Sequence, residues 1–409
     1  MHTRINLARR GVPAALLVAA LSLALATPAH ARRQDGDADE RRRAVELLQQ
    51  GNAVAALPLL EKLSAANPSD GQLMFFLGYA VLGQAKILKE AEARKAARLR
   101  ARGLMLKAQE MGYDDPLLRS VLESIPPGGG HDEVFSQNPQ ADAAMRDAEA
   151  AFVQGKFDDA IASYQTALGH DPQLYDAALF TGDMYTRKNE FDKAAEWYAR
   201  AVQIDPDRET AYRYSATPLM RQRRYDEAKA RYVEAVIAEP YNRLTWVGLG
   251  QWARAAGVQL AHPKVEIPAG FSAEGGKMTI NLDPKLSMKE DGTAAWVTYG
   301  LTRSLWHTQK FAKEFPAEKA YRHTLREEAE ALRSVVTSAK EQQKEGKVKT
   351  LDPNLARLVR LHEEGLLEAY VLLARPDPGI AQDYAAYRKA NRDKLRRYLV
   401  EYVTAGGRP

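Results

Sequence analysis

Apolar and small side chains in the middle of the chain recur at helical spacing, in pairs of segments separated by short polar turns. In residues 175–206, the first segment carries Ala178, Gly182 and Tyr185 at positions i, i+4 and i+7, which places them on one helix face. After a polar turn, a second segment shows helical spacing and ends at Asp205-Pro206, because proline disfavours the helical conformation at the preceding residue. The pattern predicts a unit of two helices joined by a polar turn.

This two-helix unit repeats with a period of 34 residues. Proline, alanine and tyrosine recur at that spacing, at Pro172, Pro206 and Pro240, at Ala160, Ala194 and Ala228, at Ala167, Ala201 and Ala235, and at Tyr164, Tyr198 and Tyr232. Small residues such as Gly182 and Ala194 fall where two helices must approach closely, since a large side chain there would overpack the contact. A fixed period over consecutive copies predicts an array of stacked helix pairs.

These positions resemble the tetratricopeptide repeat (TPR). The family pattern has small residues at the eighth, twentieth and twenty-seventh positions, an aromatic residue at the twenty-fourth and proline at the thirty-second. The matching copies, numbered from Ala141, are residues 141–174, 175–208 and 209–242, with a partial fourth copy at 243–256 that stops at Gly257. In two copies Asn189 and Arg223 replace the usual glycine of the inter-helix turn, which Gly155 keeps. The resemblance implies a helical solenoid over residues 141–257.

A weaker copy of the same pattern precedes this array. Ala44, Gly51 and Pro68 follow the repeat offsets, and a stretched unit follows over about residues 71–116. We therefore expect degenerate TPR-like helices over residues 32–124. The breaker cluster Ile125-Pro126-Pro127-Gly128-Gly129-Gly130 predicts a linker over residues 125–140.

The pattern changes after Gly257. Residues 264–267 and 277–282 alternate like short strands and are separated by glycines, which predicts a small β-hairpin. Four helical stretches are predicted near 293–314, 317–345, 353–375 and 379–403. The expected fold is therefore all-α, with a TPR helical solenoid and, over residues 258–409, a C-terminal helical bundle that carries a small β-hairpin. We expect this bundle to pack on the last repeat helix, because the open end of a solenoid exposes an apolar face.

The first 31 residues have the three parts of a secretory signal peptide. A basic segment with Arg9-Arg10 comes first, an apolar run extends from Val12 to Ala26, and the small-residue motif Ala29-His30-Ala31 follows. The sequence thus predicts export to the periplasm or outside the cell, with cleavage after Ala31. Two alternatives stay open, an uncleaved N-terminal membrane anchor and export by the twin-arginine route through Arg9-Arg10.

Charge and composition exclude several classes of function. The net charge is +5, and removal of the three arginines of the signal segment leaves about +2, which gives no support to nucleic-acid binding. The chain has no cysteine, which excludes disulfides and thiolate chemistry. It also lacks the G-x-S-x-G, H-E-x-x-H and G-x-G-x-x-G motifs, so we expect no enzymatic activity, no cofactor and no metal.

Two features of the C-terminal region keep weaker alternatives open. His323 and Glu327 have the i, i+4 spacing of two ligands on one helix face, but such pairs are more often surface polar contacts. Trp296, Tyr299 and Trp306 share one helical face with Arg303, and we interpret this stripe as core rather than as a ligand cage.

The first helices of TPR units line the concave face of the solenoid, and the resemblance implies that a partner binds there. The family's groove positions carried over to this chain predict a partner-binding set of Asp176, Leu179, Asp183, Arg187, Arg213, Thr217, Arg221, Val247, Gln251 and Arg254. Acidic groups lead along this set and arginines follow, so an extended peptide with a basic end and an acidic end would complement it. The lysine and asparagine that clamp a C-terminal carboxylate in some family members are absent.

The sequence therefore predicts an exported scaffold for protein–protein or protein–peptide interaction in a bacterial-type cell envelope. The alternative is an envelope enzyme or metal-binding protein, whose C-terminal helical domain acts on substrates that the TPR array recruits. Neither the identity of the partner nor the oligomeric state follows from the sequence.

Overall fold

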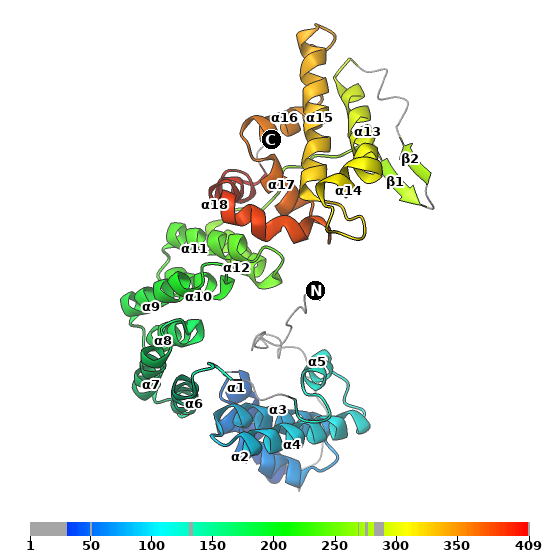
Figure 1. Cartoon of the computed structure of the whole chain (residues 1–409). Helices are drawn as coiled ribbons and strands as arrows, with labels where there is room; N and C mark the ends of the chain where they lie inside the picture. The colour runs from blue at the N-terminus through cyan, green and yellow to red at the C-terminus, as the bar shows by residue number, and fades with distance from the viewer. Residues whose placement is uncertain are drawn as a thin grey trace. The chain divides into compact units, whose positions relative to one another are not determined.

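The computed structural model of the chain describes residues 31–49, 51–130, 134–268, 270–274, 277–281 and 290–407 (Figure 1). The predicted signal peptide lies outside these residues except for Ala31, where the first helix begins. In the described part of the chain, no helix combines the length and the apolar character needed to cross a membrane. The chain divides into two compact units, Met1–Ile204 and Asp205–Pro409, which are described separately. The domain boundaries expected at 124, 140 and 257 remain predictions.

The first unit is all-helical in its described residues. Its helices are α1 (Ala31–Gln49), α2 (Ala53–Ala66), α3 (Gly71–Ile87), α4 (Ala91–Glu110), α5 (Pro116–Ser124), α6 (Pro139–Val153), α7 (Phe157–His170), α8 (Tyr175–Arg187) and α9 (Phe191–Ile204). The pairs α6–α7 and α8–α9 each pack helix on helix, as the 34-residue repeat predicts. Helix α6 begins where the Asn138 side chain accepts hydrogen bonds from the N–H groups of Gln140 and Ala141.

Small residues set the close approach of the paired helices in the first unit. A Cβ on Gly182 of α8 would lie 2.8 Å from the Tyr198 ring of α9, so only glycine fits at this crossing. The turn between α8 and α9 passes through Asn189 with φ of 61°, and the equivalent turn between α6 and α7 passes through Gly155 with φ of 73°. Both turns use the left-handed conformation, which ends one helix and starts the next.

The arginines of the long basic helix α4 hold the chain that follows it. The Arg102 guanidinium donates to the carbonyl oxygens of Leu122 and Ile125, and Arg98 donates to that of Gly129. These carbonyls lie at the end of α5 and in the proline–glycine segment, where no helical partner is available. Arg98 and Arg102 of α4 are thus committed to contacts within the unit.

The second unit combines the last repeat helices with the C-terminal region. Its elements are α10 (Glu209–Arg221), α11 (Tyr225–Ala238), α12 (Arg243–Ala256), β1 (Gly270–Glu274), β2 (Lys277–Asn281), η4 (Thr293–Trp296), α13 (Val297–Leu305), η5 (Trp306–Lys310), α14 (Phe311–Glu314), α15 (Leu325–Lys344), α16 (Pro353–Glu363), α17 (Leu367–Ala374), η6 (Ile380–Asp383), α18 (Tyr384–Glu401) and η7 (Val403–Ala405). The only paired strands in the described residues are β1 and β2, which are antiparallel, with Ser272 opposite Thr279.

A single hydrophobic core joins the last repeat helices to the C-terminal helices. It contains Tyr232 and Val236 of α11, Trp252 of α12, and buried residues of α15 to α18 such as Leu332 and Tyr398. Helix α18 lies beside α11 (Figure 1). The prediction that the C-terminal region covers the last repeat helices is confirmed, because the apolar side chains of α11 and α12 have no other core in the described part of this unit.

The structure corrects three predicted elements of the C-terminal region. Residues 264–267 form no strand, and the first strand is instead β1, which begins at Gly270. Helix α15 begins at Leu325 rather than near 317, because Thr324 caps it by accepting the N–H of Glu327. The stretch predicted near 353–375 is two helices, since Gly365 adopts a left-handed φ of 69° between them.

Candidate partner-binding face

The predicted contact residues of the first unit lie on α8. Arg187 and Asp183 form an ion pair one turn apart, with Arg187 Nε 3.1 Å from Asp183 Oδ2, and the Arg187 guanidinium stacks over the Phe152 ring of α6. Asp176 is half-buried on the same helix. Leu179, however, is 3% exposed. It belongs to the interior and is removed from the predicted contact set.

The centre of this face in the first unit is acidic. Glu149 of α6 accepts a hydrogen bond from the Tyr164 hydroxyl at 2.6 Å. Burial raises the pKa of Glu149, and the nearby Asp176 and Asp183 raise it further, against the opposing effect of Tyr164 and Lys86. The first unit therefore presents a carboxylate cluster beside one stacked arginine, Arg187.

Arg213 of the second unit is committed to its own helix. Its guanidinium contacts both carboxylate oxygens of Glu209, with distances of 2.8 Å from Nε and 3.0 Å from a terminal nitrogen, and it stacks over the Tyr214 ring. The Glu209 side chain is 3% exposed, so Arg213 neutralises a buried charge. The sequence analysis missed this structural role, although the i, i+4 spacing of Glu209 and Arg213 is a known signal for it.

The remaining predicted residues of the second unit are accessible. Thr217 and Arg221 on α10, and Val247, Gln251 and Arg254 on α12, are all exposed. The two helices contact each other directly. Neither Arg221 nor Arg254 forms an ion pair or hydrogen bond with any residue in the described part of the chain. Val247 is 41% exposed, so its apolar side chain is available for contact with a ligand.

This second-unit face, defined by Thr217, Arg221, Val247, Gln251 and Arg254, combines exposed apolar surface with free guanidinium groups. Arginine is well suited to carboxylate recognition because its planar fork can donate two parallel hydrogen bonds. An exposed valine beside it can bury part of an apolar side chain of a ligand. The arrangement can therefore hold an extended segment that carries both acidic and apolar groups.

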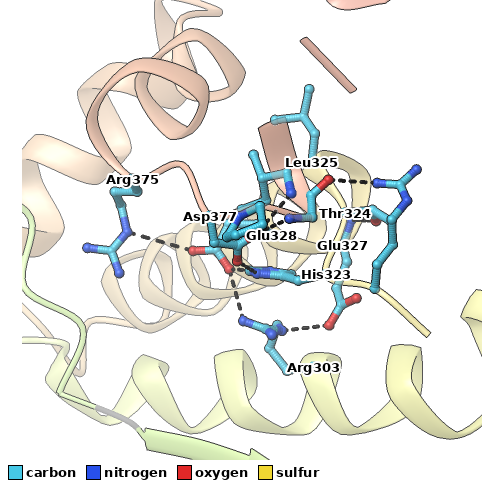
Figure 2. Close-up of polar contacts among 12 residues, drawn as sticks. Arg303, His323, Thr324, Leu325, Glu327, Glu328, Arg375 and Asp377 are labelled. Carbon is cyan, nitrogen blue, oxygen red and sulfur yellow. Dashed lines mark hydrogen bonds and ion pairs between the residues drawn. The ribbon is translucent and has the colours of Figure 1, made fainter. Parts of the chain in front are cut away.

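The candidate metal pair in the C-terminal region does not converge. His323 contacts Asp377 and Glu328, whereas Glu327 accepts hydrogen bonds from Arg303 and Tyr321 (Figure 2). Within the residues that the structure describes, no group of three or more candidate ligands is arranged for a metal ion. The His323–Glu327 spacing thus reflects an ionic network rather than a two-ligand helix face.

The aromatic stripe of α13 and its neighbours is core, as interpreted from the sequence. Trp296 and Trp306 are each 1% exposed and Tyr299 is 6% exposed. Arg303 donates to both Glu327 and Glu328, so its charge is neutralised inside the protein rather than presented to a ligand.

A family model described as tetratricopeptide repeat matches residues 41–103 and 145–209. The chain contains tetratricopeptide repeats. The first match overlaps the weaker N-terminal copy. The second match covers the part of the strong array that extends from α6 to the start of α10. Together with the helix pairs of the structure, these matches confirm the all-α TPR fold. Such repeats serve protein–protein interaction, and this is the general role that they give the chain.

Solved TPR structures are similar at low identity. The first TPR of Spaghetti (RPAP3), bound to an HSP90 peptide, is 23% identical, covers 30% of this TPR chain and 99% of its own, and has a TM-score of 0.28. YrrB, described as a TPR protein with an unusual peptide-binding site, is 14% identical and covers 54% of this chain and 98% of its own, with a TM-score of 0.25. The P58(IPK) TPR domain is 12% identical. The match covers 89% of this chain and 98% of the P58(IPK) domain, with a TM-score of 0.26. No curated protein matches the chain.

Proposed function

We propose that this TPR protein is an exported scaffold that binds an extended peptide segment of a partner protein. The observation that carries the proposal is the pair of unpartnered arginines, Arg221 and Arg254, beside exposed Val247 on the adjacent helices α10 and α12. Free cationic groups on a first-helix face supply attraction and orientation for an acidic segment. Recognition is the activity of this chain, and it needs no catalytic step, metal or cofactor.

Three features support the chemical character of the partner. The two arginines favour carboxylate groups, Gln251 and Thr217 offer neutral hydrogen bonding, and Val247 offers an apolar contact. In the first unit, Asp176 and Asp183 form a separate acidic surface that favours basic groups. The segment that binds the second-unit face is therefore expected to be acidic, with an apolar side chain beside its carboxylates.

The proposed setting is the periplasm or the cell exterior. It is supported by the basic, apolar and small-residue sequence of residues 1–31, with release after Ala31. N-terminal sequencing of the protein recovered from fractionated cells tests this directly. A chain that begins at Arg32 in the periplasmic or secreted fraction is the expected result, and a full-length chain in the membrane fraction would favour the uncleaved anchor.

The experiment for the binding face is affinity capture from an envelope extract with charge-reversed variants. Arg221→Glu with Arg254→Glu should abolish recovery of the partner and weaken binding more steeply at low salt, because exposed charges are screened by salt. The matched control is Arg231→Glu with Lys389→Glu, two exposed cations on α11 and α18 that impose the same change of net charge. Equal loss in both pairs would show a nonspecific charge effect, and undiminished recovery with the first pair would reject the face.

A further inference from the structure

His323 lies between two carboxylates in the C-terminal region of the second unit. Its Nδ1 is 2.6 Å from Asp377 Oδ2, and its Nε2 is 3.2 Å from Glu328 Oε2 (Figure 2). The imidazole side chain is 16% exposed. Nδ1 is hydrogen-bonded to Asp377, whereas Nε2 lies at ion-pair distance from the Glu328 carboxylate without an aligned hydrogen bond.

The two carboxylates are held in the ionised form by their other partners. Glu328 also accepts from the Tyr299 hydroxyl at 2.8 Å and from Arg303 at 3.2 Å. Burial alone would raise the pKa of Glu328, but His323 and Arg303 hold it below its ordinary value. Asp377 uses its other oxygen to accept the N–H groups of Gly379 and Ile380, both at 2.8 Å. Burial opposes ionisation of Asp377, and these N–H groups and His323 outweigh it and lower its pKa.

Because ionised carboxylates lie on both sides of the ring, the contacts of His323 depend on whether the ring is protonated. An imidazolium has two N–H groups and can donate to Asp377 and Glu328 together. A neutral imidazole has one, so one nitrogen lone pair then points at a carboxylate oxygen. Loss of the second proton replaces an attraction between the ring nitrogen and the carboxylate by a repulsion, at a distance of 3.2 Å in the case of Glu328. Little water is present there to screen the repulsion.

The charged groups around His323 come from three elements. Arg303 and Tyr299 belong to α13, Glu327 and Glu328 to the first turn of α15, and Arg375 and Asp377 to the segment after α17. Arg303 is the cation that opposes protonation of the ring, whereas Glu328 and Asp377 favour it. The neighbouring Arg322 is neutralised separately, by Glu318 and Asp383.

The turn held by His323 leads directly into the helix that covers the last repeat pair. The turn packs tightly, since a Cβ on Gly379 would lie 2.3 Å from the His323 carbonyl oxygen. After η6, the Tyr384 hydroxyl donates to the Ile237 carbonyl of α11 at 2.7 Å, and Arg392 Nε lies 3.1 Å from Glu234 of α11. A short stretch of chain therefore links Asp377 to the contacts that α18 makes with α11.

We propose that His323 is a proton-dependent latch, whose imidazolium joins the start of α15 to the turn 375–380 and whose deprotonation loosens that turn and the attached α18. The direction of the pKa agrees with this geometry. Burial lowers the pKa of His323, but the contacts with Glu328 and Asp377 raise it above its ordinary value of 6.5. A raised histidine pKa stabilises the folded protein fully below the unfolded value, and this contribution is lost as the pH rises through the folded value. The latch is closed in weak acid and opens toward alkaline pH.

The test follows the ring and the helix in the same full chain. Ring-proton NMR should show one resonance, lost in His323→Gln, that titrates above 6.5. Amide hydrogen exchange, corrected for its intrinsic pH dependence, should show several-fold faster exchange in α18 at about pH 9 than at about pH 6. This pH difference should vanish in His323→Gln and persist in His362→Gln, a control on α16.

A second variant keeps the proposal testable where the glutamine variant does not fold. Asp377→Asn removes one carboxylate charge but keeps an oxygen acceptor, so the His323 resonance should titrate at lower pH and α18 should loosen at lower pH. A His323 resonance that titrates at or below 6.5, or α18 protection that is independent of pH, overturns the latch. None of these measurements involves the partner, so the latch can fail without affecting the proposed binding face.

Discussion

Arg213 and Glu209 lie one helical turn apart on α10, with Arg213 Nε 2.8 Å from Glu209 Oε2 and the Glu209 side chain almost fully buried. This arginine lies at a position that TPR proteins commonly use for ligand contact, yet two of its N–H groups donate to Glu209 inside the unit. The Arg213 side chain is 23% exposed, whereas Arg221 is an exposed residue. A charge reversal at Arg213 therefore tests the fold and not the binding face.

Arg213→Glu should destabilise the second unit by up to about 3 kcal/mol, because it leaves the buried Glu209 without a counter-charge and adds a like charge beside it. Chemical denaturation followed by circular dichroism measures the change. Arg221→Glu on the same helix is the matched control and should stay within about 0.5 kcal/mol of the parent, since its side chain is exposed. Equal effects of the two substitutions would contradict the assigned role of Arg213.

The helix crossing at Gly182 gives a second prediction. Gly182→Ala should cost about 1–3 kcal/mol, because the added methyl group would lie 2.8 Å from the Tyr198 ring, which is itself 2% exposed. Gly169→Ala in α7 is the control, where a Cβ meets nothing within 4 Å. There alanine should stabilise by about 0.5–1 kcal/mol through its better helix propensity. Melting temperatures that shift in the same direction for both variants would argue against the α8–α9 packing.

The inter-helix turns give a third prediction. Substitutions at equivalent turn positions should change the free energy of unfolding in opposite directions. Arg223→Gly should stabilise the protein by about 0.5–1 kcal/mol, because Arg223 adopts a φ of 59° that L-residues occupy at a cost. Asn189→Gly should gain less, since asparagine tolerates a φ of 61° better. Gly155→Ala should lose about 1 kcal/mol although its Cβ would have open space, so that backbone strain alone accounts for the loss. Thermal unfolding of the three variants should rank them in that order.

The repeat array could be predicted from the sequence because its physical constraints are local and periodic. The small residue and the tyrosine that meet at a helix crossing, such as Gly182 and Tyr198, recur at the 34-residue spacing. Gly155 marks the turn between the two helices that each repeat contains. Burial at single contact positions could not be predicted in the same way. Leu179 and Arg213 match ligand positions in the family pattern, but their exposure depends on neighbouring side chains that the pattern does not specify.

The polar network around His323 could not be predicted from the sequence for a different reason. His323 and Asp377 are 54 positions apart, and Tyr384 and Ile237 are 147 apart, so neither contact produces a local spacing pattern in the sequence.

The joint core of α11, α12 and the C-terminal helices also changes how the binding face should be tested. Deletion of residues 258–409 would remove the part of this core that the C-terminal helices supply, so substitutions on the surface separate recognition from folding better than the deletion does.

The acidic face of the first unit gives a prediction about pH. Burial raises the pKa of Glu149 above its ordinary value of 4.5, so the folded protein holds this proton at a pH where the unfolded chain has released it. The stability of the folded state therefore falls as the pH rises from about 4.5 through the folded pKa. The penalty is fully present only above the folded pKa of Glu149.

Glu149→Gln should remove this loss, because the amide oxygen still accepts the hydrogen bond of the Tyr164 hydroxyl while no charge is buried. The variant should gain stability relative to the parent as the pH rises toward neutral, and little at about pH 4.5. Denaturant unfolding across this range measures the difference, with Glu196→Gln on the exposed side of α9 as the control that should show no such pH-dependent gain. A variant that is less stable than the parent at neutral pH would contradict this prediction. It would mean that neighbouring groups stabilise the Glu149 carboxylate, with the attraction of Lys86 stronger than the repulsion from Asp176 and Asp183.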